Sequence, residues 1–323
     1  MKGTYRIRVQ AKKVIYDFMV RRNITIVTGE SAKGKTTLID YISDYYNYGK
    51  DSGINLICDK SCIVLSGINW KQQLRDIRDS IVFIDEGNKF ISSVEFAHAV
   101  KNSDNYYVIV TRERLANLPY SINEIYGITD SGKYANVKQV YNCMYNLYGE
   151  YSSNSIGKPT LVITEDKKAG CQFFENAGEK LGFKCVSADG KANVLKSIMP
   201  RTDEEVLLVV DGAAFGPEMN SVMNYIKRYP NYTLYAPESF EWLLLRADIF
   251  RERYIADILS NPSDFIDSSS YFSWERYFTD LLEHISHSYK GYEYSKDKLS
   301  DAYLQDITMK KILDTIENIN FDE

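Results

Sequence analysis

The stretch that decides the fold is residues 24–37, which read ITIVTGESAKGKTT. Its first four residues, Ile24–Val27, are apolar or β-branched and predict a short buried strand. A loop that begins at Gly29 and ends at Gly34 follows, and the spacing of apolar residues from Lys35 predicts a helix as far as about Tyr46. The pattern G-x-x-x-x-G-K-T between a strand and a helix is typical of a phosphate-binding loop.

Each fixed position of this pattern has a chemical reason. The two glycines let the backbone curl so that its N–H groups point at phosphate oxygens, and the helix N-terminus adds its dipole. Lys35 would reach the β- and γ-phosphates, and the Thr36 hydroxyl would coordinate Mg²⁺. The predicted nucleotide-binding residues are Gly29, Glu30, Ser31, Ala32, Lys33, Gly34, Lys35, Thr36 and Thr37.

A second apolar stretch, Ile81–Ile84, ends in two acidic residues, Asp85 and Glu86. Asp85 is placed to hold the water shell of Mg²⁺, so we predict a metal site made by Thr36 and Asp85. Glu86 is placed to polarise the water that attacks the γ-phosphate, and it is a candidate catalytic residue. The adjacent glutamate favours hydrolysis over simple storage of a nucleotide.

The next apolar stretch, 107–110, ends in Thr111 and Arg112. A polar residue at this point would lie beside the γ-phosphate and sense it, so Arg112 is the second candidate catalytic residue. Arg112 or Arg114 could instead act on the nucleotide of a neighbouring subunit. Surface salt bridges would account for both arginines equally well.

Together, these segments resemble the ABC/AAA-type class of P-loop ATPases over roughly residues 5–130. An N-terminal β-meander would lead into the phosphate-binding loop. Asp85 followed by Glu86 resembles the ABC order, and Thr111-Arg112 falls where that class often carries Thr-His. The chain lacks an LSGGQ-like signature before Asp85, and the interval from Thr36 to Asp85 is too short for an ABC helical subdomain. The resemblance therefore implies a compact ATPase core rather than a transporter subunit.

The preferred cofactors are ATP and Mg²⁺. A guanine-specific N-K-x-D motif is absent, because the nearest candidate, Asn88-Lys89-Phe90-Ile91, has Ile where the Asp belongs. The sequence does not otherwise distinguish adenine from guanine.

Composition and charge limit the class of protein. The chain is 44% hydrophobic and 26% charged, which excludes wholesale disorder. Of the net charge of −5, residues 1–150 carry +4 and residues 151–323 carry −9, which argues against a broad nucleic-acid surface in the second half but leaves a local one open. No apolar run reaches the ~18 residues needed to cross a bilayer. The start lacks a signal-peptide core, and five cysteines without CxxC motifs predict reduced thiols and a cytoplasmic location.

The chain is expected to form two α/β domains, a P-loop ATPase domain at 1–150 and a second domain at 158–323. The polar, Gly- and Ser-containing stretch 148–159 is the predicted linker. After it, strands and helices alternate again, which predicts a mostly parallel sheet covered on both faces. Apolar residues at helical spacing predict C-terminal helices over 240–259, 274–287 and 301–319.

Acidic residues follow two of the predicted strands of this second domain, at Glu165 and Asp211. Glu165, and Asp211 in a D-x-A-x-x-G arrangement ending at Gly216, resemble the Toprim fold of topoisomerases, primases and nucleases of the OLD group, in which carboxylates hold Mg²⁺ for phosphodiester chemistry. Ala213 stands where the second Asp of that motif belongs. Glu238 or Glu241 could supply a replacement, which gives Glu165, Asp211 and Glu241 as a candidate second metal site.

Three readings of this domain remain open: an active metal nuclease, a degenerate Toprim-like sensor or docking domain, and an unrelated doubly wound domain. For the whole chain we expect an ATPase whose nucleotide state controls the second domain, which resembles prokaryotic antiviral defence or mobile-element ATPases. The alternatives are a non-hydrolytic nucleotide-dependent interaction module and an ATP-gated nuclease. The expected partners are ATP and a protein partner or a second copy of the chain. A nucleic-acid partner stays open, and no membrane partner is expected.

Overall fold

The computed structural model describes residues 1–30, 33–130, 140–149, 157–199, 201 and 203–321. The chain divides into two compact α/β units. The first consists of Met1–Glu150 and Asn261–Phe272, and the second of Tyr151–Ser260 and Ser273–Glu323. Most of the predicted linker lies outside the described residues.

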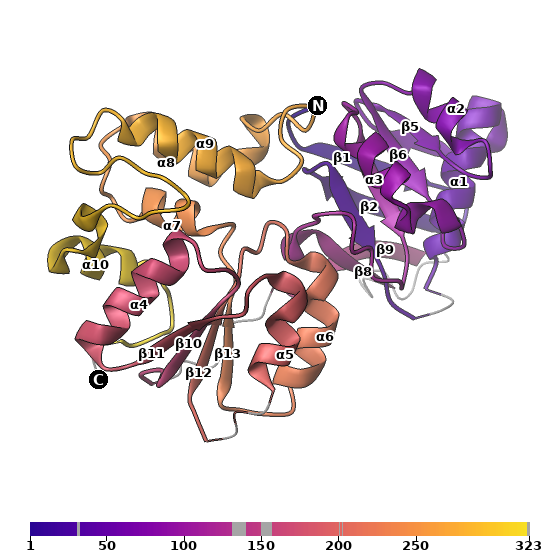
Figure 1. Ribbon diagram of the computed structural model, residues 1–323. Helices are drawn as coiled ribbons and strands as arrows, with labels where there is room; N and C mark the ends of the chain where they lie inside the picture. Colours follow the sequence, from indigo (N-terminus) through magenta and orange to yellow (C-terminus); the bar gives the residue numbers. More distant parts are fainter. Residues whose placement is uncertain (31–32, 131–139, 150–156, 200, 202, 322–323) are drawn as a thin grey trace. The chain divides into compact units, whose positions relative to one another are not determined.

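The first unit is built on one mixed sheet (Figure 1). Its strands are β1 (Tyr5–Gln10), β2 (Val14–Val20), β3 (Ile24–Val27), β4 (Asn55–Ile57), β5 (Ser61–Val64), β6 (Ser80–Ile84), β7 (Tyr106–Val110), β8 (Ile125–Asp130) and β9 (Val140–Asn146). Within the described residues their order is β4-β1-β2-β9-β8-β3-β7-β6-β5. The run β8-β3-β7-β6-β5 is parallel, whereas β1 pairs antiparallel with both β2 and β4, and β8 pairs antiparallel with β9.

The N-terminal strands do not form the expected meander. β1 and β2 make an antiparallel hairpin, but β2 next pairs with β9, and both β9 and β8 lie between β2 and β3. The prediction of a meander into the phosphate-binding loop was therefore wrong. Local alternation of apolar residues reveals a strand but not its neighbour, and here the neighbours come from more than a hundred residues away.

Helices cover both faces of this sheet. They are α1 (Lys35–Tyr48), α2 (Trp70–Asp76) and α3 (Val94–Lys101), with 3-10 turns η1 (Gly49–Ser52), η2 (Lys89–Ser92) and η3 (Ile122–Glu124). Leu38 and Ile42 of α1 enter the same core as Val108 and Phe83 of the sheet. Tyr107, which neighbours Val108 and therefore points to the opposite face, contacts Phe96 of α3 edge-on at 6.0 Å.

The segment Asn261–Phe272 was expected to be part of the second domain (158–323), but it belongs to the first unit. It contains the 3-10 turn η5 (Pro262–Asp264) and binds the N-terminus. The Gly3 N–H donates to Ser263 O at 2.6 Å, and the Met1 ammonium pairs with an Asp267 carboxylate oxygen at 2.9 Å. These hydrogen bonds join residues more than 250 positions apart.

The second unit contains a parallel sheet in the order β11-β10-β12-β13. The strands are β10 (Leu161–Thr164), β11 (Lys184–Ser187), β12 (Val206–Val209) and β13 (Tyr232–Tyr235). The helices between them are α4 (Ala169–Leu181), α5 (Val194–Ile198) and α6 (Gly216–Ile226), with a 3-10 turn η4 (Lys191–Asn193). α4 covers one face of the sheet, and α5 and α6 cover the other (Figure 1).

The chain after β13 is helical, as expected, but in shorter pieces. They are α7 (Phe240–Arg246), α8 (Arg253–Ser260), α9 (Trp274–Ser286), the 3-10 turn η6 (Asp301–Leu304) and α10 (Asp306–Leu313). The single helix predicted over 240–259 breaks after Ala247, because Asp248 has φ +50°, a left-handed conformation that ends a helix. Within the described residues, no helix has the length and apolar character needed to cross a membrane.

Candidate functional site

The predicted phosphate-binding loop connects β3 to α1. Gly29 and Gly34 have φ of +118° and +86°, in the region that favours glycine. A Cβ atom on Gly34 would also come within 2.6 Å of the Tyr16 hydroxyl. The backbone therefore requires glycine at position 34 for two independent reasons, and α1 begins immediately after it at Lys35.

Tyr16 supports this loop from β2, and sequence reasoning did not identify it. Its hydroxyl donates a hydrogen bond to Gly34 O at 2.7 Å, and its side chain is only 2% exposed. Burial raises the pKa of Tyr16, which keeps the hydroxyl a neutral donor. No local motif signals such a contact, because β2 and the loop meet only in the folded sheet.

Lys35 is buried beside the loop with backbone partners alone. Its ammonium donates to Gly29 O at 3.0 Å and to Glu30 O, and the residue is 5% exposed. Burial lowers the pKa of Lys35 and the nearby Arg112 lowers it further, while the more distant carboxylates of Glu86, Asp85 and Glu30 oppose this shift. Among the described residues Lys35 has no carboxylate within ion-pair distance. A buried cation that lacks a counter-ion fits a site for an anion.

The acidic pair follows β6 at the same edge of the sheet. β6, β7 and β3 are parallel and in register, with Ile84 opposite Ile109 and Val27 opposite Val110, so the residues that follow them gather together. Burial raises the pKa of Asp85, and the hydrogen bonds that it accepts from the Glu86 N–H, at 2.8 Å, and from the Thr36 hydroxyl oppose this shift. Thr36 and Asp85, the predicted Mg²⁺ ligands, are thus neighbours, and an oxygen-only pair suits that ion.

β7 lies between β3 and β6, so the two residues after it stand between the loop and the acidic pair. The Arg112 Nε lies 3.4 Å from Glu86 Oε1. The structure therefore brings Lys35, Thr36, Asp85, Glu86 and Arg112 to one place. Ser31 and Ala32 lie outside the described residues, and Lys33 is exposed.

The second acidic group lies at the carboxyl edge of the other sheet, where Glu165, Asp211 and Glu241 line one cavity of about 40 Å³. Glu165 Oε2 accepts a hydrogen bond from the Asp211 N–H at 3.2 Å, and the Phe240 N–H donates to Asp211 Oδ1 at 3.2 Å. Desolvation raises the pKa of Glu165 to about 7. Desolvation and the carboxylates of Glu275, Glu165 and Glu241 raise the pKa of Asp211 well above its ordinary value.

A lysine that sequence reasoning missed supplies the positive charge here. Lys296 pairs with Glu275 and lies 3.8 Å from Glu241 Oε1, which also accepts a 2.8 Å hydrogen bond from the Tyr294 hydroxyl. Glu241 Oε2 is buried and has no hydrogen-bond partner among the described residues. No group of three or more acidic, His or Cys side chains in the described ranges has an arrangement that could hold a metal ion.

The remaining predicted residues do not add to this group. Glu238 does not line the cavity, and its backbone carbonyl accepts a hydrogen bond from the Ala213 N–H at 3.2 Å. Ala213 is 2% exposed, so the position of the missing Asp is filled by a packed methyl group. Gly216 begins α6.

Comparison of the chain with protein-family models, curated proteins and solved structures finds no match.

Proposed function

We propose that this chain binds Mg²⁺-ATP at the loop between β3 and α1 and hydrolyses it, and that the nucleotide state controls the second unit, which acts as a docking domain. One observation carries the proposal. The Lys35 ammonium is buried without an ion-pair partner in the described chain, at the start of a helix and opposite Asp85 and Glu86. A phosphate chain would supply the missing negative charge.

Each residue has a defined role in this mechanism. Lys35 and the loop N–H groups hold the phosphates, while Thr36 and Asp85 hold Mg²⁺, which when bound offsets the charge of the phosphate oxygens. Glu86 orients a water for in-line attack on the γ-phosphate and accepts its proton. Arg112 stands between the loop and Glu86, where a cation stabilises the charge of the transition state.

The second unit supports a docking role better than phosphodiester cleavage. Two of its carboxylates, Glu275 and Glu241, already lie beside the Lys296 ammonium, and Ala213 occupies the position at which a Toprim-like site needs another acid. A P-loop ATPase domain joined to a Toprim-like domain resembles prokaryotic antiviral defence or mobile-element ATPases of the OLD-type grouping. By this resemblance we propose a role in antiviral defence or in a mobile element.

Turnover by the purified full chain tests the proposal. ATP hydrolysis is measured with and without DNA or RNA, for wild type, Glu86→Gln and the matched control Glu113→Gln, which alters an exposed glutamate just after β7. We expect Glu86→Gln to lower the rate ~100-fold or more while ATP affinity stays within about threefold, because general-base contributions are of this size. Glu113→Gln should hydrolyse ATP at the wild-type rate.

Two outcomes would overturn the hydrolytic proposal. Equal turnover by wild type and Glu86→Gln would remove Glu86 from the mechanism. Binding of ATP by wild type without turnover under any of these conditions would favour the non-hydrolytic interaction module.

A further inference from the structure

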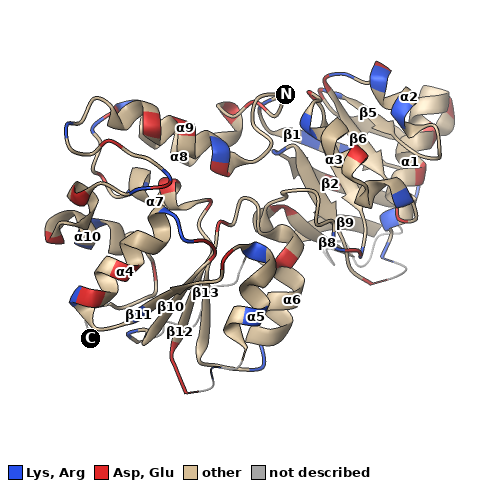
Figure 2. Cartoon of the chain, viewed as in Figure 1, with Lys and Arg blue, Asp and Glu red and all other residues tan. Residues whose placement is uncertain are grey.

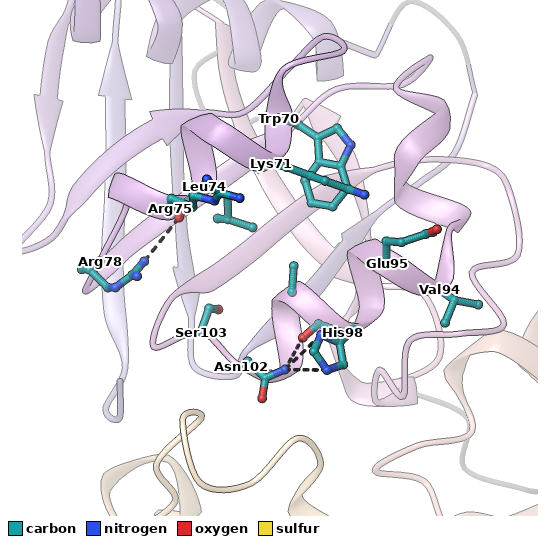
Figure 3. Close-up of a pocket in the computed structure, with 11 residues that line it drawn as sticks. Trp70, Lys71, Leu74, Arg75, Arg78, Val94, Glu95, His98, Asn102 and Ser103 are labelled. Carbon is teal, nitrogen blue, oxygen red and sulfur yellow. Dashed lines mark hydrogen bonds between the residues drawn. The ribbon is translucent and has the colours of Figure 1, made fainter.

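A groove on the first unit is separate from the nucleotide site. It lies between α2 and α3, has a volume of about 640 Å³ and shares no residue with the loop or with the acidic pair (Figure 3). These two helices flank β6 in the chain, since α2 precedes it and α3 follows it. The axes of helices that pack against each other usually lie 8–10 Å apart. An open groove between α2 and α3 therefore leaves room for a further segment to pack there.

The floor of the groove is apolar and rests on a cluster of packed aromatic rings. Trp70 stacks on Phe90 at 5.0 Å between ring centroids and meets the edge of Phe96 at 5.6 Å. Leu74 and Ala99 complete the floor, and Val94, 69% exposed, stands at the rim. The aromatic rings support this floor from below, and the surface that a ligand would meet is mainly aliphatic.

The charges of the groove are arranged on one wall. Lys71, Arg75 and Arg78, from α2 and the residues just after it, all line the groove (Figure 3). Figure 2 shows basic residues, in blue, on and beside α2. Lys71 and Arg75 form no ion pair with any described residue. The α3 wall offers one carboxylate, Glu95, together with His98 and the Asn102 amide, which hydrogen-bond to each other.

We propose that this groove binds an acidic amphipathic helix of a protein partner. A helix laid between α2 and α3 would bury its apolar face on Leu74 and Ala99, and acidic side chains along one edge would meet Lys71 and Arg75. The unpaired cations give this docking its charge complementarity and its orientation. The proposal goes beyond ATP hydrolysis and does not depend on it.

A nucleic acid fits the same groove less well. Binding of single strands depends on exposed aromatic faces for base stacking. The Trp70 ring is only 6% exposed, with Phe90 stacked on it and the Lys71 ammonium 5.5 Å above the ring centroid.

Selection from a peptide library tests the proposal. A library of 18-residue helix-forming peptides with randomised faces is panned against the full chain, and the enriched peptides are measured by fluorescence anisotropy. We expect enriched peptides to carry an apolar stripe flanked by Asp or Glu. Lys71→Glu/Arg75→Glu should weaken their binding at least tenfold, and Ala99→Trp, which fills the groove without a change of charge, should do the same.

Lys101→Glu is the matched control, because Lys101 is an exposed lysine on α3 that does not line the groove. It should change affinity less than twofold, and circular dichroism melts should show that all variants fold. The proposal is overturned if no peptide is enriched, if enriched peptides lack acidic residues, or if the double variant binds them as well as wild type does. Binding of 20-nucleotide DNA or RNA that the double variant loses would instead assign the groove to nucleic acid.

Discussion

Arg112 and Glu86 form an ion pair across the ends of β7 and β6, with Arg112 Nε 3.4 Å from Glu86 Oε1. Both side chains are partly exposed, 47% and 42%, so the pair adds little to stability. The ion pair instead fixes the position of the Glu86 side chain, beside the place where the γ-phosphate of the proposed ATP would lie. A bound phosphate would compete with Glu86 for the Arg112 guanidinium.

Arg112→Ala should therefore impair turnover more than binding. We expect kcat to fall ~10-fold or more with ATP affinity within about threefold, because the guanidinium acts mainly on charge that develops in the transition state. Arg228→Ala, at an exposed arginine that follows α6 in the second unit, is the matched control and should leave kcat unchanged. Unchanged kcat in Arg112→Ala would show that the ion pair is only a surface contact.

The buried carboxylate of Glu124 is predicted to be a main support of the first unit. It is 0% exposed and accepts hydrogen bonds from Arg21 Nε at 2.7 Å and from Arg22 Nε at 3.2 Å. Glu124→Ala would remove the buried carboxylate that pairs with Arg21 and Arg22, and should cost about 3–5 kcal/mol of unfolding free energy. Urea unfolding measures this cost, and Glu95→Ala, at an exposed site, should change it by less than about 0.5 kcal/mol. Similar losses in both variants would contradict the assignment.

Protonation of Asp267 should lower the stability of the first unit in acid. Burial alone would raise its pKa, but hydrogen bonds from the Met1 ammonium and from Ser269 lower the pKa of Asp267 to about 2. A pKa below the unfolded value means that the carboxylate stabilises the fold above about pH 4 and loses this contribution as the pH falls towards 2. Solvent screening keeps the effect under about 1 kcal/mol. Asp267→Asn should therefore lower the melting temperature at pH 7 and have no effect near pH 2, and an equal effect at both pH values would refute this.

The second unit should cleave nucleic acid weakly or not at all. Lys296 supplies the cation among its carboxylates, and by the proposed Toprim resemblance Ala213 stands where a further acid would be needed. The assay compares wild type with Glu165→Ala and Asp211→Ala on single- and double-stranded DNA and on RNA, in Mg²⁺ and in Mn²⁺. Robust cleavage by wild type that both variants lose would mean that the missing acid is compensated.

Local patterns in the sequence predicted the elements that carry the candidate nucleotide site. The strand Ile24–Val27, the start of α1 at Lys35 and the acidic pair after β6 all follow from short-range rules, because glycine geometry and apolar runs act over a few residues. The second parallel sheet and its helix α4 were predicted for the same reason.

Long-range partners could not be predicted in this way. Tyr16 contacts Gly34, and Lys296 joins Glu241 and Glu275, only because the folded chain brings separate segments together. β9 escaped prediction because its residues are only partly buried and show no alternation. The helix predicted over 240–259 breaks because Asp248 has a left-handed backbone conformation. This conformation is unfavourable for a residue other than glycine, so the sequence does not announce it.

The most direct test of the central claim is a titration of wild type and Lys35→Ala with a non-hydrolysable ATP analogue and Mg²⁺, followed by calorimetry. Wild type should bind one equivalent, and Lys35→Ala should bind ~10- to 100-fold more weakly, as expected for the loss of a charge-assisted hydrogen bond of about 1.5–3 kcal/mol. Lys101→Ala, at an exposed lysine of α3 outside the loop, should retain affinity within about threefold. Equal affinities of wild type and Lys35→Ala, or no binding by wild type, would contradict the assignment of the loop as a nucleotide site.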